Sequence, residues 1–185
     1  TTAFGDTIPE TNVNVKDNYQ KASGFTQYTL KLFKNKLILN AGLRVDYFSG
    51  INDNTVVSPR FGLSYNILPT TTLSASTGIF RQSPEYLWLT SDIRNKNLEF
   101  IKADHFVLGL EHLFTPELRF SIEAYYKNYS NYPVSTLVPT YVLIGAGTEN
   151  GPNLLFGEAV SEGKGYSKGI DISIHKKLPG NGIYG

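Results

Sequence analysis

Apolar and polar residues alternate along most of the chain, and short polar turns and longer loops separate the alternating segments. In the segment 37–47 every second side chain is apolar or aromatic: Leu37, Leu39, Ala41, Leu43, Val45 and Tyr47. The intervening residues include Asn40, Arg44 and Asp46. Successive side chains of a β-strand point to opposite faces, so this pattern predicts a strand with one apolar and one polar face.

The same alternation recurs in six other segments, and an eighth strand is predicted to begin where the chain reaches Gly182. The six segments are 25–33, 60–67, 73–79, 105–114, 119–127 and 169–175. With the residues that flank these alternating stretches, the predicted strands run to about 9–13 residues, the length that a tilted strand needs to cross a bilayer. Strands of ordinary globular proteins average about 5–6 residues. Length and alternation together favour a membrane β-barrel over a soluble sandwich.

The connections between these segments alternate between short and long. Short polar turns lie at 34–36, 69–71, 115–117 and 179–181, and long connections are predicted at 50–57, 82–103 and 135–165. In a simple meander the short turns gather at one end and the long loops at the other, which is typical of outer-membrane barrels. We therefore predict an all-β antiparallel meander of about eight strands that forms part of a large transmembrane β-barrel.

The domain organisation follows from the same pattern. Residues 1–18 show no period and are interpreted as a loop or lead-in, and 19–185 as the strands and loops of one barrel portion. No apolar run approaches the roughly 18–20 residues of a transmembrane helix, so we expect the membrane to be crossed by strands. The net charge of +1 gives no reason to expect a nucleic-acid partner.

Candidate catalytic and metal-binding groups are sparse. There is no cysteine, and His105 and His112 are an odd number of residues apart, so they face opposite sides of one strand. The glycine-rich segment 163–169 leads into an alternating strand where a dinucleotide fingerprint needs a helix, and we interpret it as a loop entering that strand. We expect no metal site, no cofactor and no enzyme activity.

The polar rows supply candidate lumen-facing residues. If the apolar rows meet outer-membrane lipid, the opposite side chains point into a wet lumen. Charged members of these rows are Arg44, Arg60, Glu111, Glu123 and Asp171. We interpret Glu123 and Asp171 as lumen carboxylates that face arginines, which is simpler than interpreting them as a pair of catalytic acids.

One loop is singled out as a candidate ligand site. The segment 81–89 holds the only tryptophan and lies in a long loop on the predicted external side. Loops on rigid scaffolds often carry binding, so Arg81, Gln82, Tyr86 and Trp88 are the candidate ligand-binding residues. The simpler alternative is that the residues 86–89 form an interfacial aromatic anchor or a packed loop.

Several segments, in this order and spacing, resemble the barrel strands of TonB-dependent outer-membrane receptors. They are GFTQYTLKL at 24–32, LNAGLRVDY at 39–47, SPRFGLSY at 58–65, STGIFRQSPEY at 76–86, YYKNY at 125–129 and GYSKGID at 165–171. The resemblance covers the chain from about residue 20 to its end, and it implies a 22-stranded barrel with a plugged lumen. The chain is therefore expected to be part of a longer polypeptide.

The resemblance also implies a function. It implies the barrel wall of an energised uptake protein in the bacterial outer membrane, with an iron chelate, cobalamin, a sugar or a peptide as the unknown small ligand. The TonB complex would act through parts of the protein outside this chain. Two alternatives stay open at this point: a complete small eight-stranded barrel with a structural or adhesive role, and a soluble β-sandwich binding module.

Overall fold

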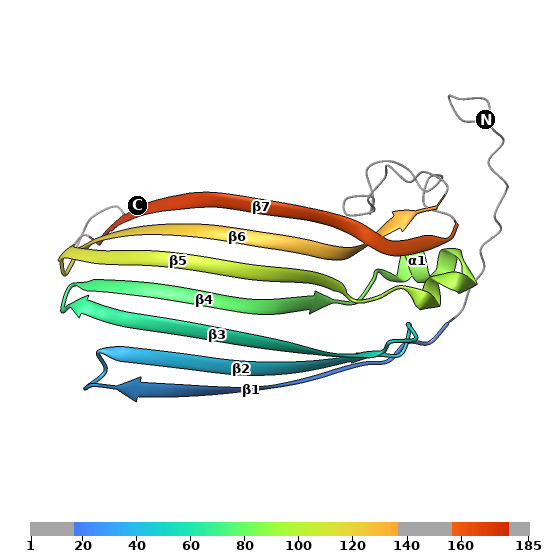
Figure 1. Ribbon diagram of the computed structural model, residues 1–185, viewed down its shortest axis with the longest axis horizontal. Helices are drawn as coiled ribbons and strands as arrows, with labels where there is room; N and C mark the ends of the chain where they lie inside the picture. Colours follow the sequence, from blue (N-terminus) through green and yellow to red (C-terminus); the bar gives the residue numbers. More distant parts are fainter. Residues whose placement is uncertain (1–16, 137–156, 178–185) are drawn as a thin grey trace, which may run out of the picture.

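The computed structural model describes residues 17–136 and 157–177. They form one seven-stranded antiparallel sheet in which each strand pairs with its neighbours along the chain, in the order β1 to β7 (Figure 1). The strands are β1 (Lys21–Leu32), β2 (Leu37–Phe48), β3 (Thr55–Leu68), β4 (Thr71–Gln82), β5 (Ile101–Thr115), β6 (Leu118–Ser135) and β7 (Ala159–Lys176). The predicted antiparallel meander is confirmed.

The two ends of the sheet differ, as the loop lengths predict. Tight turns after β1, β3 and β5 lie at one end, which we call the turn end. The longer connections lie at the other, the loop end, where the β4–β5 loop contains the helix α1 (Tyr86–Ser91) and the 3-10 helix η1 (Ile93–Asn97) (Figure 1). Within the described residues no helix is long and apolar enough to span a membrane.

Several strands are longer than the alternation indicates, so the predicted loops at 50–57, 82–103 and 135–165 are too wide. β3 begins at Thr55, β5 at Ile101 and β7 at Ala159. The reason is pairing: the β6–β7 ladder continues to Ser135↔Ala159, beyond the stretch with a clear period. The predicted strand at 182–185 and the turn at 179–181 lie outside the described residues.

The glycine-rich segment 163–169 is part of β7 rather than a loop entering it. A Cβ atom added to Gly163 would lie 2.7 Å from the carbonyl oxygen of Tyr132, at an irregular point of the β6–β7 register. A Cβ atom at Gly169 would lie 2.6 Å from the hydroxyl of Tyr125. Glycine therefore lets β7 approach β6 closely, and the segment needs no phosphate to explain it.

The register sorts the side chains of the whole sheet onto two faces. One row runs straight across the strands and is entirely apolar, namely Leu30, Leu39, Leu63, Ala75, Leu108, Ala124 and Ile170. A row on the opposite face, three residues nearer the loop end, contains Gln27, Gly42, Arg60, Gly78, His105, Lys127 and Ser167. We call these two sides the apolar face and the polar face.

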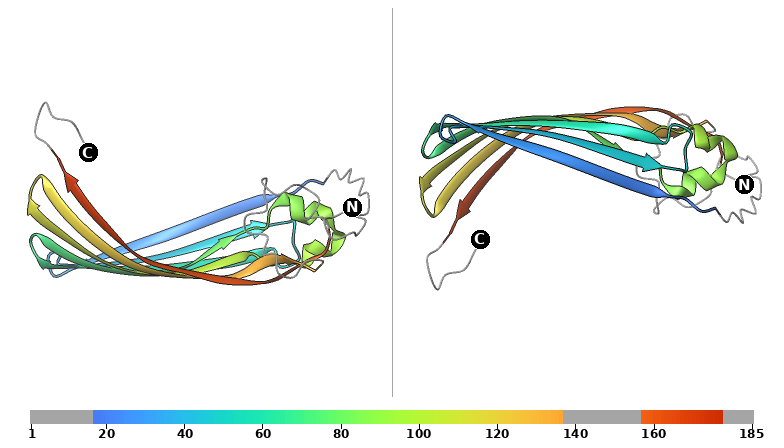
Figure 2. Two further views of the ribbon diagram at one scale, coloured as in Figure 1. Left: turned by 90° about the horizontal axis from the view of Figure 1, so that it is seen from above. Right: turned by 90° about the horizontal axis from the view of Figure 1, so that it is seen from below.

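The buried core of the described residues is not between two layers. The sheet is strongly twisted and curved, so that β1 and β7 cross when it is viewed edge-on (Figure 2). Buried apolar side chains gather instead at the loop end, where they are Phe48, Ile51, Trp88, Leu89, Leu98, Phe100, Ile101 and Ala159. A soluble sandwich needs a second sheet over the apolar face, and the described residues supply none.

Candidate ligand site at the loop end

The β4–β5 loop is held in place by a fully buried asparagine. The side-chain amide of Asn95 donates to the carbonyl oxygens of Trp88 at 2.7 Å and Gly157 at 3.0 Å. Its carbonyl oxygen accepts from the backbone N–H of Ala159 at 2.7 Å. These bonds join α1 and η1 to the start of β7, so two external connections form one packed unit.

An ion-pair group reinforces the same junction from the solvent side. Arg94 contacts the carboxylate of Asp92 at 2.6 Å and that of Glu158 at 2.8 Å. Side-chain and backbone hydrogen bonds from Arg94 hold the pKa of Asp92 at about 2, below its ordinary value. The Asp92 carboxylate therefore stays ionised under all ordinary conditions, and it also accepts from the backbone N–H of Arg94 at the start of η1.

A small aromatic cluster lies beside this packed loop, on the polar face. The rings of Tyr19 and Tyr86 stack with centroids 5.3 Å apart, and Phe48 meets Tyr86 edge-on at 5.9 Å. The ammonium group of Lys21 lies 4.7 Å from the ring centroids of both Phe48 and Tyr86. Burial is the first cause of a raised pKa at Tyr19. The cluster presents a cation framed by aromatic faces, an arrangement that favours both cation–π and stacking contacts.

The sheet opens between β3 and β4 at the loop end. Their pairing stops at Arg60↔Gly78, although both strands continue beyond these residues. The carbonyl oxygen of Pro59 is directed toward β4, since it lies 3.3 Å from the position of a Cβ at Gly78. Both polar groups of a residue in an antiparallel strand point to the same neighbour, and proline has no N–H to donate. Pro59 therefore ends the ladder and opens a seam.

Arg81 lies at this seam, between two hollows. The first hollow, about 370 Å³, is lined by residues of the β2–β3 loop together with Arg81 and Glu99. The second, about 190 Å³, is lined on the polar face by Lys21, Arg44, Asp46 and Phe48, and again by Arg81. We call these the outer and the inner hollow. Arg81 itself is only partly exposed, and its Nε atom is buried without an acceptor.

The rest of the polar face carries a series of paired charges and stacked rings. Arg44 donates to both carboxylate oxygens of Asp46, and Arg119 lies 3.5 Å from Glu111. The Arg60 guanidinium lies 4.2 Å from the Phe80 ring, which stacks in turn against His105. Glu123 and Asp171 stand directly opposite each other on β6 and β7. The five residues predicted to face a lumen thus share one face of the sheet.

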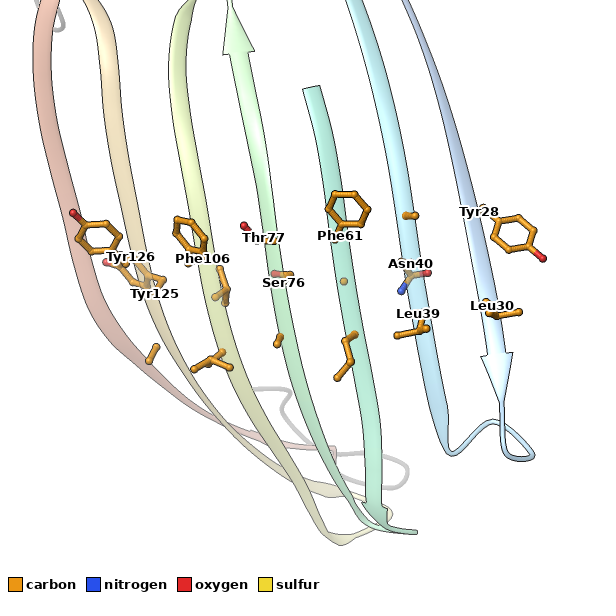
Figure 3. A pocket seen from close by; sticks show the side chains of 17 residues that line it. Tyr28, Leu30, Leu39, Asn40, Phe61, Ser76, Thr77, Phe106, Tyr125 and Tyr126 are labelled. Carbon is orange, nitrogen blue, oxygen red and sulfur yellow. The ribbon is translucent and has the colours of Figure 1, made fainter. Parts of the chain in front are cut away.

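The apolar face has a broad hollow of about 920 Å³ near the middle of the sheet (Figure 3). Its lining comes from the six neighbouring strands β1 to β6 and consists mostly of aliphatic and aromatic side chains, among them Leu39, Phe61 and Phe106. Many side chains on this face are exposed in the described residues, including Ile170 at 66% and Val57 at 48%. An apolar face of this extent needs an apolar solvent or a partner layer.

The apolar band runs diagonally across the strands. On β3 the band extends toward the loop end as far as Val57, six residues beyond Leu63. On β7 the residue in the same row as Leu63 is Ile170, and the next side chain on this face toward the loop end is already a lysine, Lys168. Six residues at about 3.3 Å, over four strand spacings of about 4.8 Å, give a slope of roughly 45°. Strands of transmembrane barrels tilt by about 35–45°. The band is therefore level with a membrane if the strands are tilted as in such barrels.

The structure separates the four predicted ligand-binding residues. Arg81 lines both hollows, and Tyr86 belongs to the aromatic cluster. Gln82 is an exposed residue at the end of β4. Trp88 is only 3% exposed and packs in the loop-end core, as in the packed-loop alternative.

The sequence reasoning missed the other members of this site. Lys21 belongs to β1, Phe48 to β2 and Tyr19 to the segment before β1. Arg44 was predicted only as a lumen-facing residue, and it also lines the inner hollow. Their alternation pattern marks them as polar-face residues but does not reveal that α1 folds over them. Over the described ranges no group of three histidine or acidic side chains could hold a metal ion.

Comparison with known proteins decides the family. The chain matches the family described as TonB dependent receptor-like, beta-barrel, over residues 1–184. It belongs to this family of TonB-dependent receptor barrels. The family places it in the bacterial outer membrane, and its members are receptors rather than enzymes. No curated protein matches the sequence.

Solved structures share the fold. The chain is similar to the siderophore receptor PirA from Pseudomonas aeruginosa, with 15% identity and a TM-score of 0.64 over 88% of this chain and 29% of that one. The ferric enterobactin receptor PfeA from the same organism, in complex with enterobactin, is 18% identical, with a TM-score of 0.68 over 88% of this chain and 25% of that one. The FrpB iron transporter from Neisseria meningitidis is 13% identical, with a TM-score of 0.62 over 86% of this chain and 23% of that one. The chain thus spans about a quarter of the length of these structures.

Proposed function

We propose that this chain forms part of the barrel wall of an outer-membrane uptake protein, with its apolar face toward lipid and its polar face toward the lumen. The observation that carries the proposal is the diagonal apolar band opposite a polar face that carries charged and polar side chains, with the ion pairs Arg44–Asp46 and Arg119–Glu111 among them. A lipid-facing surface with that slope and a wet interior are the two requirements of a large barrel. Acyl chains would fill the hollow around Leu39, Phe61 and Phe106.

In the proposed barrel the open edges of the sheet pair with further strands. β1 and β7 each have one neighbour in the described residues. An unpaired backbone group in hydrocarbon costs several kcal/mol, so an open sheet is not a stable membrane structure. A closed small barrel would require β1 to pair with β7 or with a strand beside it.

The proposed ligand is a scarce small molecule that is held first at the loop end. Lys21, Tyr86 and Arg81 lie where the lumen face meets the external loops, and the packed loop around Asn95 holds Tyr86 in place. The relatives with solved structures are described as receptors or transporters of iron or siderophores. An iron chelate is accordingly the ligand class to test first, followed by cobalamin, sugars and peptides.

Energy for uptake is proposed to come from the TonB complex, through parts of the polypeptide outside this chain. The test uses cells that express the full-length receptor as the only route for labelled ferric chelates, cobalamin, a maltodextrin or a short peptide. At least one ligand should accumulate in cells with an intact TonB system and fail to accumulate when that system is deleted. Accumulation of none of them, with the receptor present in the outer membrane, would contradict the proposal.

A further inference from the structure

We propose that a group of cations on the apolar face, at the border of the apolar band toward the loop end, binds the phosphate-bearing head group of an outer-leaflet lipid. The inference rests on the proposed function and deepens it, because it concerns the lipid that would cover this face of the barrel wall. The cations come from β4, β5 and β7 and are Arg81, Lys102, Lys164 and Lys168. We call these four residues the basic patch.

On β4 and β5 the register turns two cations of the patch toward the apolar face. Arg81 lies two residues beyond Ile79 and stands directly opposite Lys102. The ammonium group of Lys102 lies 2.8 Å from the Asp104 carboxylate, whereas Arg81 has no carboxylate within ion-pair distance among the described residues and its Nε atom has no acceptor. Like charges directly opposite each other on two strands are destabilising, and an anion bound between them removes that penalty.

β7 supplies the other two cations, beside a pair of stacked tyrosines. Lys164 and Lys168 are exposed and share the face of Ile170, because an even number of residues separates each of them from it. The rings of Tyr126 and Tyr166 stack with centroids 6.2 Å apart, and the Lys168 ammonium group lies 5.8 Å from the centroid of the Tyr166 ring. Tyrosines are enriched at the level of the lipid head groups. The patch therefore lies where the apolar band ends and the head groups begin.

The register brings the four cations within the area of one large head group. Three neighbouring rows on this face are Arg81–Lys102–Ser130, Ile79–Asp104–Asn128–Tyr166 and Thr77–Phe106–Tyr126–Lys168. Lys164 lies four residues beyond Lys168, level with the first row. Three strand spacings of about 4.8 Å and four residues of about 3.3 Å enclose an area of roughly 14 by 13 Å. A single phosphate is too small to span this area, whereas a sugar head group with more than one phosphate covers most of it.

The carboxylates around the patch leave most of its charge available to an anion. They are Asp53 and Glu99 at the outer hollow, Asp104 on β5 and Glu162 on β7. Only Asp104 is within ion-pair distance of a patch cation in the described part of the chain, and that cation is Lys102. Glu99 and Glu162 lie beyond the cations toward the loop end, so the cations stand between them and the apolar band. A lipid phosphate directly above the band therefore meets positive charge first.

The hollow below the patch fits the acyl chains of the same lipid. Thr77, Phe106 and Tyr126 line this hollow of about 920 Å³ (Figure 3), and Lys168 stands directly opposite Tyr126. A head group held by the patch would thus place its chains in the hollow. At the turn end, Lys176 is the only lysine or arginine that the described strands present on this face. The combination of cations and hollow is accordingly confined to the external border.

The test measures lipid binding to the purified full-length receptor by native mass spectrometry in a mild detergent. The probes are diphosphoryl lipid A, the same lipid without its phosphates, and inorganic pyrophosphate. Arg81→Gln combined with Lys168→Gln removes two charges, and Arg81→Lys combined with Lys168→Arg keeps them. Lys176→Gln is the matched control, because it removes a lysine from the same face of β7 at the opposite border.

We expect the wild-type receptor to bind diphosphoryl lipid A at least tenfold more tightly than the lipid without phosphates. Each lysine or arginine near an anionic lipid surface contributes about fivefold, so the double glutamine variant should weaken this binding tenfold or more. The charge-keeping variant and Lys176→Gln should change it less than threefold. Asp104→Asn releases Lys102 from its ion pair and should tighten the binding.

Three outcomes would overturn the inference: equal affinity for the two lipids, unchanged affinity in the double glutamine variant, and binding of pyrophosphate as tight as that of the lipid. The last would assign the patch to a free phosphate. None of these outcomes depends on uptake, and a receptor that transports its ligand without distinguishing the lipids would retain the proposed function. If melting temperatures show that the double variant fails to fold, Lys164→Gln at an exposed position replaces it, with a loss of threefold or more expected.

Discussion

The backbone N–H of Ala159 donates to the side-chain oxygen of Asn95 over 2.7 Å, at the point where β7 begins. Because the same amide also donates to carbonyl oxygens on both sides, one side chain joins α1, η1 and β7. The loop that presents Tyr86 is consequently held by a buried polar network rather than by apolar packing alone. Such networks are stable when every member is satisfied and costly when one is removed.

Replacing Asn95 with alanine should loosen this loop without unfolding the strands. The substitution leaves the Gly157 carbonyl oxygen and the Ala159 N–H without their partner, and each unsatisfied buried group costs about 1–3 kcal/mol. Hydrogen exchange should therefore accelerate in the residues 86–98 and at the start of β7. Asn97→Ala is the matched control, since Asn97 is exposed and accepts only from Asn52 in the described structure. Equal exchange in both variants would contradict the role of Asn95.

The junction at Asp92 should weaken only in strong acid. The pKa of Asp92 is lowered to about 2 by Arg94, so the bonds of the ionised carboxylate stabilise the loop at any pH above the ordinary value. That contribution is lost as the pH falls from about 4 through 2. Since Arg94 is largely exposed, solvent screening keeps this contribution to the stability of the loop small. Asp92→Asn should remove the acid-dependent rise in hydrogen exchange of η1, and a rise that persists in this variant would assign it elsewhere.

The sequence predicts the two faces of the sheet well because alternation is a local property. Leu39 and Arg44 point to opposite faces wherever the strand lies. The register then pairs each of them with residues of β1 and β3 that point to the same face. Strand ends are less predictable, as β7 shows. Its first ten residues are rich in glycine and charge, and they become strand only because β6 continues beside them.

The candidate site was only partly predictable for a different reason. Arg81 and Tyr86 stand out in the sequence as polar and aromatic residues of a long loop. The inner hollow, however, is lined by Arg81 together with Lys21 and Phe48, which lie far away along the chain, and it is these two residues that contact the ring of Tyr86. Its shape depends on where Pro59 ends the β3–β4 ladder, and the burial of Trp88 depends on the fold of α1. These are properties of tertiary packing that no local pattern contains.

Two glycines of β7 should respond differently to a single added methyl group. Gly163→Ala places a Cβ 2.7 Å from the backbone oxygen of Tyr132, which cannot move without disturbing the ladder. Gly165→Ala is the control, because no atom of the described structure lies within 4 Å of its Cβ position. We expect the full-length receptor to lose about 1–3 kcal/mol with Gly163→Ala and little with Gly165→Ala. Urea titration of the folded receptor in lipid vesicles measures the difference, and equal losses would contradict the close approach.

The assignment of the faces can be tested with arginine at adjacent positions. Leu63 lies in the central apolar row, and Ser64 is on the polar face beside Ser74. An arginine on the lipid face near the midplane costs roughly 2–4 kcal/mol, whereas a lumen position tolerates charge. Leu63→Arg should therefore reduce folding of the full-length receptor into bilayers, while Ser64→Arg folds normally. The reverse result would mean that the faces are exchanged.

The two edges of the described sheet should stay apart in the full-length receptor. This chain contains no cysteine, so cysteine pairs introduced into it report on proximity once any cysteine elsewhere in the full-length receptor has been replaced. Thr29→Cys with Asn40→Cys is the positive control, because Thr29 and Asn40 face each other on β1 and β2 and their side chains are hydrogen-bonded at 2.7 Å. Thr29→Cys with Gly169→Cys, or with Asp171→Cys, should not cross-link, since further strands are expected to separate β1 from β7. Efficient disulfide formation in either pair would instead bring the edges together and favour a small closed barrel.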